Sequence, residues 1–290
     1  MSEFLQFILA GMTVGAIYSV VALGFTMVFN ASGVVNFAQG EFVMLGGMLT
    51  VYGLALGMPY SVAALFAVVA TSLISVALYD FAIRPARGAP VYALIIITVG
   101  ASILIRGLTK IAFGTGPRDL PPLLGDEPVR VAGAVILPQS MLVIASTLAI
   151  YLCLWLLLQK TLLGHAVVAS ANNRMAAQMV GIDVDVMTRF SFSLSAAIGA
   201  FSGILISPIT LVSYDMGTML ALKGFAAAIL GGMGSPLGAI LGGVLVGLSE
   251  AMSAGYLSSQ YKDATAFVII ILVLFVFPNG LVGKSGHERV

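Results

Sequence analysis

Charged side chains are scarce in this sequence: Asp, Glu, Lys and Arg together make up 9% of its 290 residues. A soluble globular domain usually carries about 25% charged residues, which help to cover its water-facing surface. Hydrophobic residues reach 60% here, and the mean hydropathy is +1.09. The composition therefore excludes a soluble globular protein and predicts a chain whose solvent is the lipid bilayer.

Cysteine and histidine are nearly missing, which narrows the available chemistry. The single cysteine, Cys153, cannot form an internal disulfide, and we interpret it as a small apolar packing residue. The two histidines, His165 and His287, have no nearby Cys and no HExxH spacing, so no metal site is predicted. The net charge of +1 provides no basic field of the kind that nucleic-acid binding requires.

Catalytic motifs are lacking as well. Gly283-Lys284-Ser285 resembles the end of a phosphate-binding loop, but Pro278 stands where that loop needs its first glycine. The sequence contains no nucleophile elbow and no carboxylate pair placed for acid–base work. We therefore expect no cofactor and no enzymatic activity in this chain, and any ATP used in transport would be bound by another polypeptide.

Long apolar runs dominate what is present. A helix rises about 1.5 Å per residue, so roughly 20 apolar residues cross the hydrocarbon core. Charge-poor stretches occupy residues 4–30, 42–57, 60–83, 91–113, 138–159, 190–212, 219–250 and 264–278. The stretch 219–250 is too long for one span, and glycines and a proline interrupt it at 231–236. It predicts two helices, or one helix and a re-entrant piece.

These runs predict an all-α fold, because lipid cannot satisfy the open backbone edge of a sheet. The expected architecture is a polytopic transmembrane helical bundle of eight or nine spans, forming a single domain over residues 1–290. A broken or re-entrant segment is compatible with this pattern.

Basic residues predict the orientation, since they concentrate in cytoplasmic loops. They gather in two interior loops and in the C-terminal tail: Arg84, Arg87, Lys160, Arg174, Arg189, Lys284 and Arg289. We therefore expect loop 161–189 and the C-terminus to be cytoplasmic, and the proline-rich loop 114–137 to be periplasmic. The side of the N-terminus depends on whether residues 30–40 turn at the surface or dip back into the membrane.

Polar residues cluster unusually in residues 30–46, where Asn36, Gln39 and Glu41 stand among apolar residues and glycines. Polar groups within a membrane are costly and usually face a bundle interior or a water-filled path. The alternative is that Glu41 lies at the interface, at the end of a span.

The interior loop 162–188 predicts a short helix over residues 171–180, with Gly181 as its stop. Ala176, Met179 and Val180 would share one face. Such a face fits a groove on a soluble partner, or it lies on the membrane surface.

Small residues recur four apart at Gly234, Gly238 and Gly242. This spacing lets helix backbones approach closely in lipid. The contacts are either internal to the chain or with a second membrane subunit.

Together these segments resemble the LivH-type permeases of branched-chain amino acid ABC transporters. The resemblance lies in residues 15–41, in Ala176-Ala177 with Gly181-Ile182, in the glycine-rich residues 225–247, and in the ending 278–283. Gln39 departs from the family, in which His is more usual, and a basic residue expected early in the loop is replaced around Val167.

The resemblance implies a multi-pass permease of the bacterial inner membrane that translocates branched-chain or related amino acids. Its implied partners are the lipid bilayer, a homologous second permease, two cytoplasmic ATPase subunits and a periplasmic substrate-binding protein. It also implies that the ATPase contacts the loop at Ala176, Ala177, Gly181 and Ile182. Our hypothesis is that Asn36, Gln39 and Glu41 line or gate the path.

Other functions remain open at this point. Permeases of the same family carry urea, short amides or aromatic acids. An ion-coupled secondary carrier would need paired ionisable groups at the membrane midplane and an inverted repeat. Glu41 and Glu250 are candidates for such groups, but no convincing repeat accompanies them. A membrane scaffold without transport activity is the third alternative.

Overall fold

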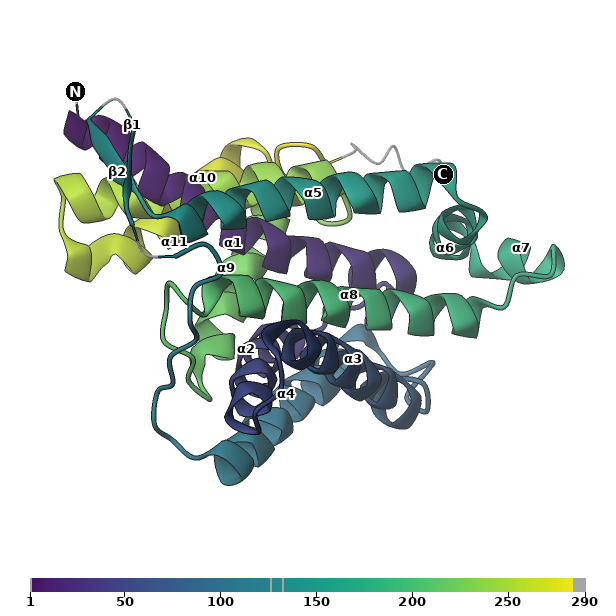
Figure 1. Ribbon diagram of the computed structural model, residues 1–290. Coiled ribbons are helices and arrows are strands. Elements are labelled where there is room, and N and C mark those ends of the chain that lie inside the picture. The colour runs from purple at the N-terminus through teal and green to yellow at the C-terminus, as the bar shows by residue number, and fades with distance from the viewer. Residues whose placement is uncertain (1, 126, 132, 284–290) are drawn as a thin grey trace.

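Long helices form the protein, and several of them run roughly along one direction while others cross them obliquely (Figure 1). The computed structural model describes residues 2–125, 127–131 and 133–283. Within these ranges, seven helices are long and apolar enough to cross a membrane. They are α1 (Ser2–Ser32), α3 (Tyr60–Leu78) with the π-helical turn η1 (Tyr79–Ile83), α4 (Val91–Phe113), α5 (Pro138–Lys160), α8 (Val184–Ile206), α10 (Pro236–Tyr256), and α11 (Lys262–Val276) with the 3-10 turn η2 (Ser259–Tyr261).

Two shorter helices, α2 (Gln39–Ala55) and α9 (Met216–Gly231), complete the bundle. Both have many buried residues, and both pack against α1 and against each other. Counted with the seven long helices, they confirm the prediction of an all-α polytopic bundle. The range 219–250 does divide into two helices, because Gly232 and Gly234 adopt positive φ angles that end α9 before α10 begins.

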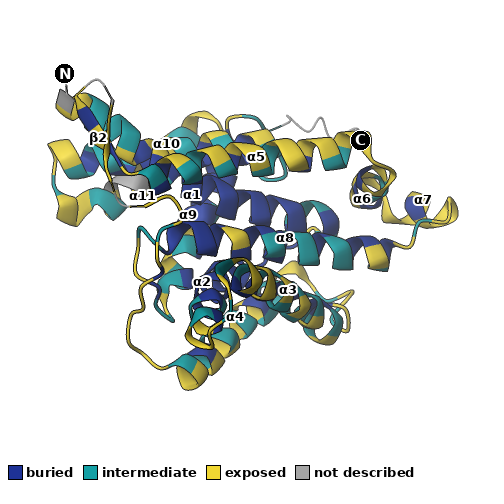
Figure 2. Ribbon diagram, in the orientation of Figure 1, coloured by how far each residue is buried: buried dark blue, intermediate teal, exposed yellow. Residues whose placement is uncertain are grey.

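The centre of the bundle is α1, which contacts α10, α8, α9 and α5 (Figure 2). Its seam with α10 is built from glycines, which bring the two backbones together. A methyl group on Gly15 would lie 2.7 Å from the Cα of Val244, and one on Gly11 would lie 2.9 Å from the Cα of Leu248. Close helix packing of this kind gives a core without large side chains at the crossing.

Residues 33–38 carry the chain from the end of α1 back into the bundle. Asn36 and Ala38 are fully buried there, and the Phe37 ring packs against the rings of Phe25 and Phe225. The following helix, α2, therefore begins inside the bundle rather than at its surface. The sequence left open whether residues 30–40 turn at the surface or return inward, and the structure shows that they return into the bundle.

The two ends of the bundle carry different elements (Figure 1). At one end, strands β1 (Val129–Val131) and β2 (Ala134–Ile136) form an antiparallel hairpin. The Gln6 side chain of α1 donates a hydrogen bond to the carbonyl oxygen of Val135 and accepts one from its N–H. At the other end lie α6 (Leu162–Asn172) and α7 (Arg174–Met179). The first described residues are at the hairpin end, and the chain is last described at the α6 end.

Some boundaries differ from those predicted. Helix α8 begins at Val184 rather than at 190, because Asp183 caps it by accepting hydrogen bonds from the N–H groups of Asp185 and Val186. The loop 162–188 holds two short helices, α6 and α7, instead of one helix over 171–180. The hairpin within 114–137 was not predicted. Lys284 and Arg289, which support the predicted cytoplasmic C-terminus, lie outside the described residues.

Candidate translocation site

Asn36 lies at the bottom of the returning segment, with no exposed surface. Its side-chain oxygen accepts a hydrogen bond from the N–H of Ala38, 3.1 Å away, which shapes the turn into α2. Its side-chain nitrogen makes no hydrogen bond to any described residue. A buried donor without a partner costs free energy, so this amide is an unsatisfied polar group in the interior of the bundle.

Gln39, the first residue of α2, is enclosed between α1 and α8. Its nitrogen donates to the carbonyl of Ser195 at 3.2 Å, and its oxygen accepts from the Ser195 hydroxyl at 2.7 Å. Gly24 and Gly199 provide the space, since a methyl group on either would press on the Gln39 side chain. Gln39 thus joins two helices through bonds that satisfy its amide.

Glu41 lies in the first turn of α2 and is only 1% exposed, so it is not at the end of a surface span. Its Oε1 accepts a hydrogen bond from Ser102 of α4 at 2.9 Å. Its Oε2 makes no hydrogen bond to the described residues. That oxygen lies over Gly217 in the first turn of α9, where a methyl group would be 2.8 Å from it. The carboxylate therefore sits where two half-length helices begin.

Helix α4 supplies the other wall of the site, although it lies at the edge of the bundle and packs mainly against α2 and η1 (Figure 1). A polar stripe on α4 faces inward. The Thr98 hydroxyl accepts from the N–H of Phe37, Ser102 donates to Glu41, and Arg106 donates to the Thr218 hydroxyl of α9 at 2.7 Å.

The sequence prediction did not assign Ser102, Arg106 or Thr218 to the site. Their signal was the spacing of polar residues at 98, 102, 106 and 110, one helical turn apart within an apolar helix. That spacing defines a stripe but does not say which helix it faces.

A carboxylate and a guanidinium placed among hydroxyl groups inside a helical membrane bundle are typical of a protein that moves polar solutes. The family model for the permease component of the branched-chain amino acid transport system matches residues 7–276. The chain belongs to that family. The predicted resemblance to LivH-type permeases is thereby confirmed.

Several relatives of the permease are similar over nearly their whole length. The high-affinity branched-chain amino acid transport system permease protein LivH of Escherichia coli K12 is 32% identical, covering 99% of this chain and 98% of that protein. BraD of Pseudomonas aeruginosa, described in the same words, is 31% identical with the same coverage. The probable branched-chain amino acid transport permease protein LivH of Methanocaldococcus jannaschii is 30% identical, covering 90% of this chain and 87% of that protein.

The loop residues Ala176, Ala177, Gly181 and Ile182 of the permease lie together at the α6 end. Ala177 is buried, and its carbonyl accepts from the N–H of Ile182 at 3.0 Å, which closes the turn after α7. Gly181 makes that turn with a φ of +85°. Ala176 faces outward, where large apolar side chains are also exposed: Met175, Met179 and Val180.

The predicted packing glycines divide between a turn and a helix. Gly234 lies before α10 with a φ of +96°, and its carbonyl accepts from the side-chain nitrogen of Asn30 at 2.9 Å. Gly238 and Gly242 lie on α10 and meet the backbone of α9 at Gly231 and Ala227. These three glycines contact other helices of the same chain.

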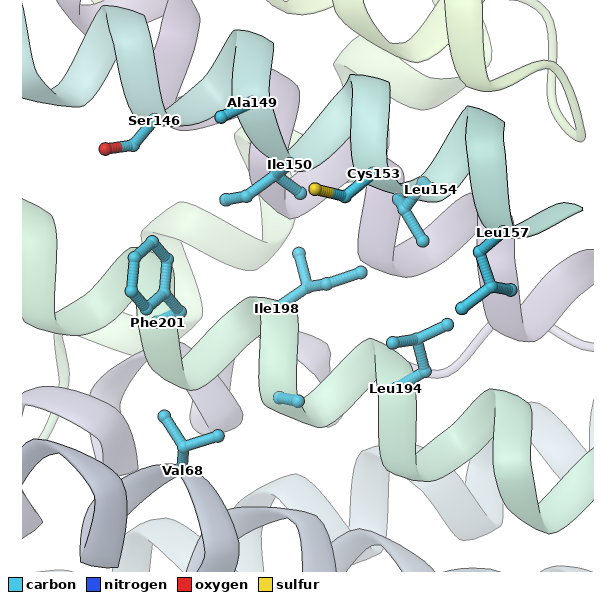
Figure 3. Close-up of a pocket in the computed structure, with 11 residues that line it drawn as sticks. Val68, Ser146, Ala149, Ile150, Cys153, Leu154, Leu157, Leu194, Ile198 and Phe201 are labelled. Atoms are coloured by element: carbon cyan, nitrogen blue, oxygen red, sulfur yellow. The ribbon is translucent and has the colours of Figure 1, made fainter.

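An apolar groove of about 450 Å³ runs between α5, α8 and α3 (Figure 3). Cys153 and Ile150 of α5 face Ile198 of α8 across it, and Ser146 is the one hydroxyl residue in its lining. The groove offers no charged group, so it is unsuited to binding a polar solute. The candidate site for a polar solute is the one around Glu41.

Proposed function

We propose that the permease is a membrane-spanning subunit of an ATP-driven importer that moves branched-chain amino acids across the bacterial inner membrane. The observation that carries the proposal is the position of Glu41, a buried carboxylate with one unbonded oxygen where α2 and α9 begin. Ionisable groups inside a membrane are expensive and mark the paths of solutes. Broken helices that meet inside a bundle are a common architecture of transport sites. Asn36 and Gln39 line or gate the same path.

The substrate class is supported by the relatives, whose names describe transport of branched-chain amino acids. Because these relatives align with nearly the whole chain, the same solutes are the first to test. Urea, short amides and aromatic acids are the runner-up solutes for the same mechanism.

The proposed assembly contains this permease, a homologous second permease, two cytoplasmic ATPase subunits and a periplasmic substrate-binding protein. ATP hydrolysis belongs to the separate subunits. The α6–α7 end faces the cytoplasm in this arrangement, together with the C-terminus. The hairpin loop 114–137 and the N-terminal end of α1 then face the periplasm.

The ATPase contact is proposed at α7. Its outward face carries Met175 and Met179, which are 75% and 83% exposed, and Val180 follows at 77%. A short helix with exposed apolar side chains fits a groove on a soluble partner. Movement at α7 reaches the bundle through Asp185 of α8, which forms ion pairs with Arg84 and Arg87 of the turn after α3.

The test is ATP-dependent uptake into proteoliposomes that contain all the proposed subunits, with leucine, phenylalanine, urea and benzoate as solutes. Saturable leucine uptake that disappears without ATP is the expected result. Uptake of another solute would keep the mechanism and replace the substrate. Leucine uptake driven by an ion gradient without ATP would favour a secondary carrier and overturn the proposal.

The role of Glu41 is tested in the same vesicles with Glu41→Ala. We expect uptake to be abolished while the complex still assembles, because the variant removes the carboxylate and leaves the helices in place. Asp119→Ala, which removes an exposed carboxylate from loop 114–137, is the matched control and should transport normally. Near-normal uptake by assembled Glu41→Ala would remove Glu41 from the path.

A further inference from the structure

Glu41 and Arg106 bring opposite charges to one site without pairing with each other. Glu41 bonds to the hydroxyl of Ser102, and Arg106 bonds to the hydroxyl of Thr218. Ser102 and Arg106 are one turn apart on α4, and Thr218 is the third residue of α9. Among the described residues, neither Glu41 nor Arg106 belongs to any ion pair.

This arrangement is unusual for a membrane interior. Two nearby unlike charges in an apolar setting would normally pair, because each is costly when it is compensated only by a neutral hydroxyl. Here the carboxylate is held by α2 and the guanidinium by α4, and the Thr218 hydroxyl lies close to both. The remaining Oε2 of Glu41 and the side-chain nitrogen of Asn36 also have no hydrogen-bond partner in the described chain.

A zwitterion is the ligand that such a pair would compensate. Its ammonium group would donate to Glu41 Oε2, and its carboxylate would accept from the guanidinium of Arg106 in the bidentate manner that this group favours. The first turns of α2 and α9 meet beside Glu41, and their positive helix-dipole ends favour the charged form of that carboxylate. Each group of the ligand thus finds an unlike charge.

The exposure of these residues differs between the walls of the site. Glu41 is buried, whereas Ser102, Arg106 and Thr218 are partly exposed, so the α4 and α9 walls form the more accessible side of the site. Each of the three walls also contributes to one apolar cluster, with Leu45 from α2, Ile105 from α4 and Met216 from α9. An aliphatic side chain attached to the zwitterion would find apolar contacts there.

We infer that Glu41, Arg106 and Thr218 form a head-group site that binds the ammonium and carboxylate groups of an α-amino acid as it passes through this chain. The inference rests on the proposed importer function and adds a binding role for Arg106. It also separates the candidate solutes. Urea and amides carry no charge for either residue, and an aromatic acid would use Arg106 but leave Glu41 without a partner.

The experiment measures binding of radiolabelled leucine to the full chain in lipid nanodiscs, and leucine uptake in cells whose own copy of the chain is deleted. Two competitors each lack one head group: 3-methylbutylamine has no carboxylate, and 4-methylpentanoate has no ammonium. The variants are Arg106→Gln and Glu41→Gln, with Arg106→Lys and Glu41→Asp as conservative partners. Arg130→Gln is the control, because Arg130 is an exposed arginine of β1 that lies outside the site.

Saturable leucine binding is expected for the wild-type chain, with both competitors weaker than leucine. Loss of one charged contact should weaken leucine binding by about 10-fold to 100-fold. In Arg106→Gln, leucine and the amine should compete equally, and in Glu41→Gln, leucine and the acid should compete equally. Arg130→Gln should behave like wild type, and the conservative variants should recover part of the discrimination. The conservative variants carry the test if a Gln variant does not reach the membrane.

Two outcomes would overturn the inference while leaving the proposed function intact. One is cellular leucine uptake that depends on the chain but keeps its KM in both Gln variants. The other is leucine uptake in cells with no saturable leucine binding to the wild-type chain in nanodiscs. Failure of the proposed function is distinct, because then cells would show no uptake of branched-chain amino acids that depends on this chain.

Discussion

Gly40 and Gly217 touch backbone to backbone where α2 and α9 begin. A methyl group on Gly217 would lie 2.7 Å from the carbonyl oxygen of Gly40, and one on Gly40 would overlap the carbonyl oxygen of Gly217. The contact is possible because neither residue has a side chain. It brings Glu41, the next residue of α2, over the first turn of α9, and so it builds the candidate site.

Substitution of either glycine should therefore separate the two half-length helices. We expect Gly40→Ala to lower the free energy of unfolding by about 1–3 kcal/mol, the usual cost of overfilling a packed region. Thermal unfolding of the purified permease in detergent measures this change.

Gly100→Ala is the matched control for that substitution, since Gly100 lies in α4 and a methyl group there would have no neighbour within 4 Å. An added Ala in an open helical position should be neutral or stabilising by about 0.5–1 kcal/mol. Equal stability of the Gly40→Ala and Gly100→Ala variants would show that α2 and α9 do not meet closely.

The long helices were predictable from the sequence because a run of about 20 apolar residues satisfies its backbone hydrogen bonds in lipid by forming a helix. The half-length helices were harder to predict. Residues 30–40 carry polar side chains and glycines, which are compatible both with a surface turn and with a return into the bundle. Burial of Asn36 and the packing of Phe37 decide between them, and those contacts come from residues distant in the sequence.

The candidate site was predictable on one side only. Asn36, Gln39 and Glu41 stood out because polar groups in an apolar segment are costly. The polar residues of the opposite wall, Ser102 and Arg106, could be seen in the sequence, but their contacts with α2 and α9 could not. Those contacts depend on the orientation of α4, which its packing determines. The pairing of Lys223 with Glu250 was missed for the same reason, as the two residues lie on different helices.

Lys223 anchors a second polar cluster, which joins α1, α9, α10 and α11. Its ammonium lies 2.8 Å from Glu250 Oε1 and 2.7 Å from Asp263 Oδ1, and the Tyr18 hydroxyl donates to Glu250 Oε2 at 2.7 Å. Lys223→Met would leave the buried Glu250 carboxylate without its main cation. We expect a loss of about 3–5 kcal/mol in unfolding free energy, because removing one partner strands the other charge.

Two further variants make the Lys223 prediction specific. Replacing both partners, in Lys223→Met with Glu250→Gln, should recover much of the loss, since the one carboxylate left without Lys223, Asp263, is 40% exposed and stays solvated. Lys262→Met should cost less than about 1 kcal/mol, because Lys262 is 44% exposed and 3.8 Å from Glu250. The cluster would be irrelevant to stability if Lys223→Met and Lys262→Met unfolded at the same temperature in a thermal melt.

The exposed apolar face of α7 leads to a prediction about coupling. Met179 is 83% exposed and supports no buried packing in the described chain, so Met179→Asp should leave the stability of the isolated permease unchanged within about 0.5 kcal/mol. In the assembled transporter, a charge in an apolar interface loses water without gaining a partner. We therefore expect weaker ATPase binding and fewer leucine molecules moved per ATP hydrolysed, measured together in proteoliposomes.

The matched control places the same charge elsewhere on the permease surface. Leu123→Asp changes an exposed leucine of loop 114–137, at the opposite end of the bundle, and should leave the ratio of leucine transport to ATP hydrolysis unaltered. If Met179→Asp retains both normal ATPase binding and the normal ratio, α7 does not contact the ATPase. If both variants lower the ratio equally, the effect is not local to α7. A loss of coupling in Met179→Asp but not in Leu123→Asp would identify the α6–α7 end as the cytoplasmic end. It would thereby fix how Arg106 and Glu41 are oriented relative to the two sides of the membrane.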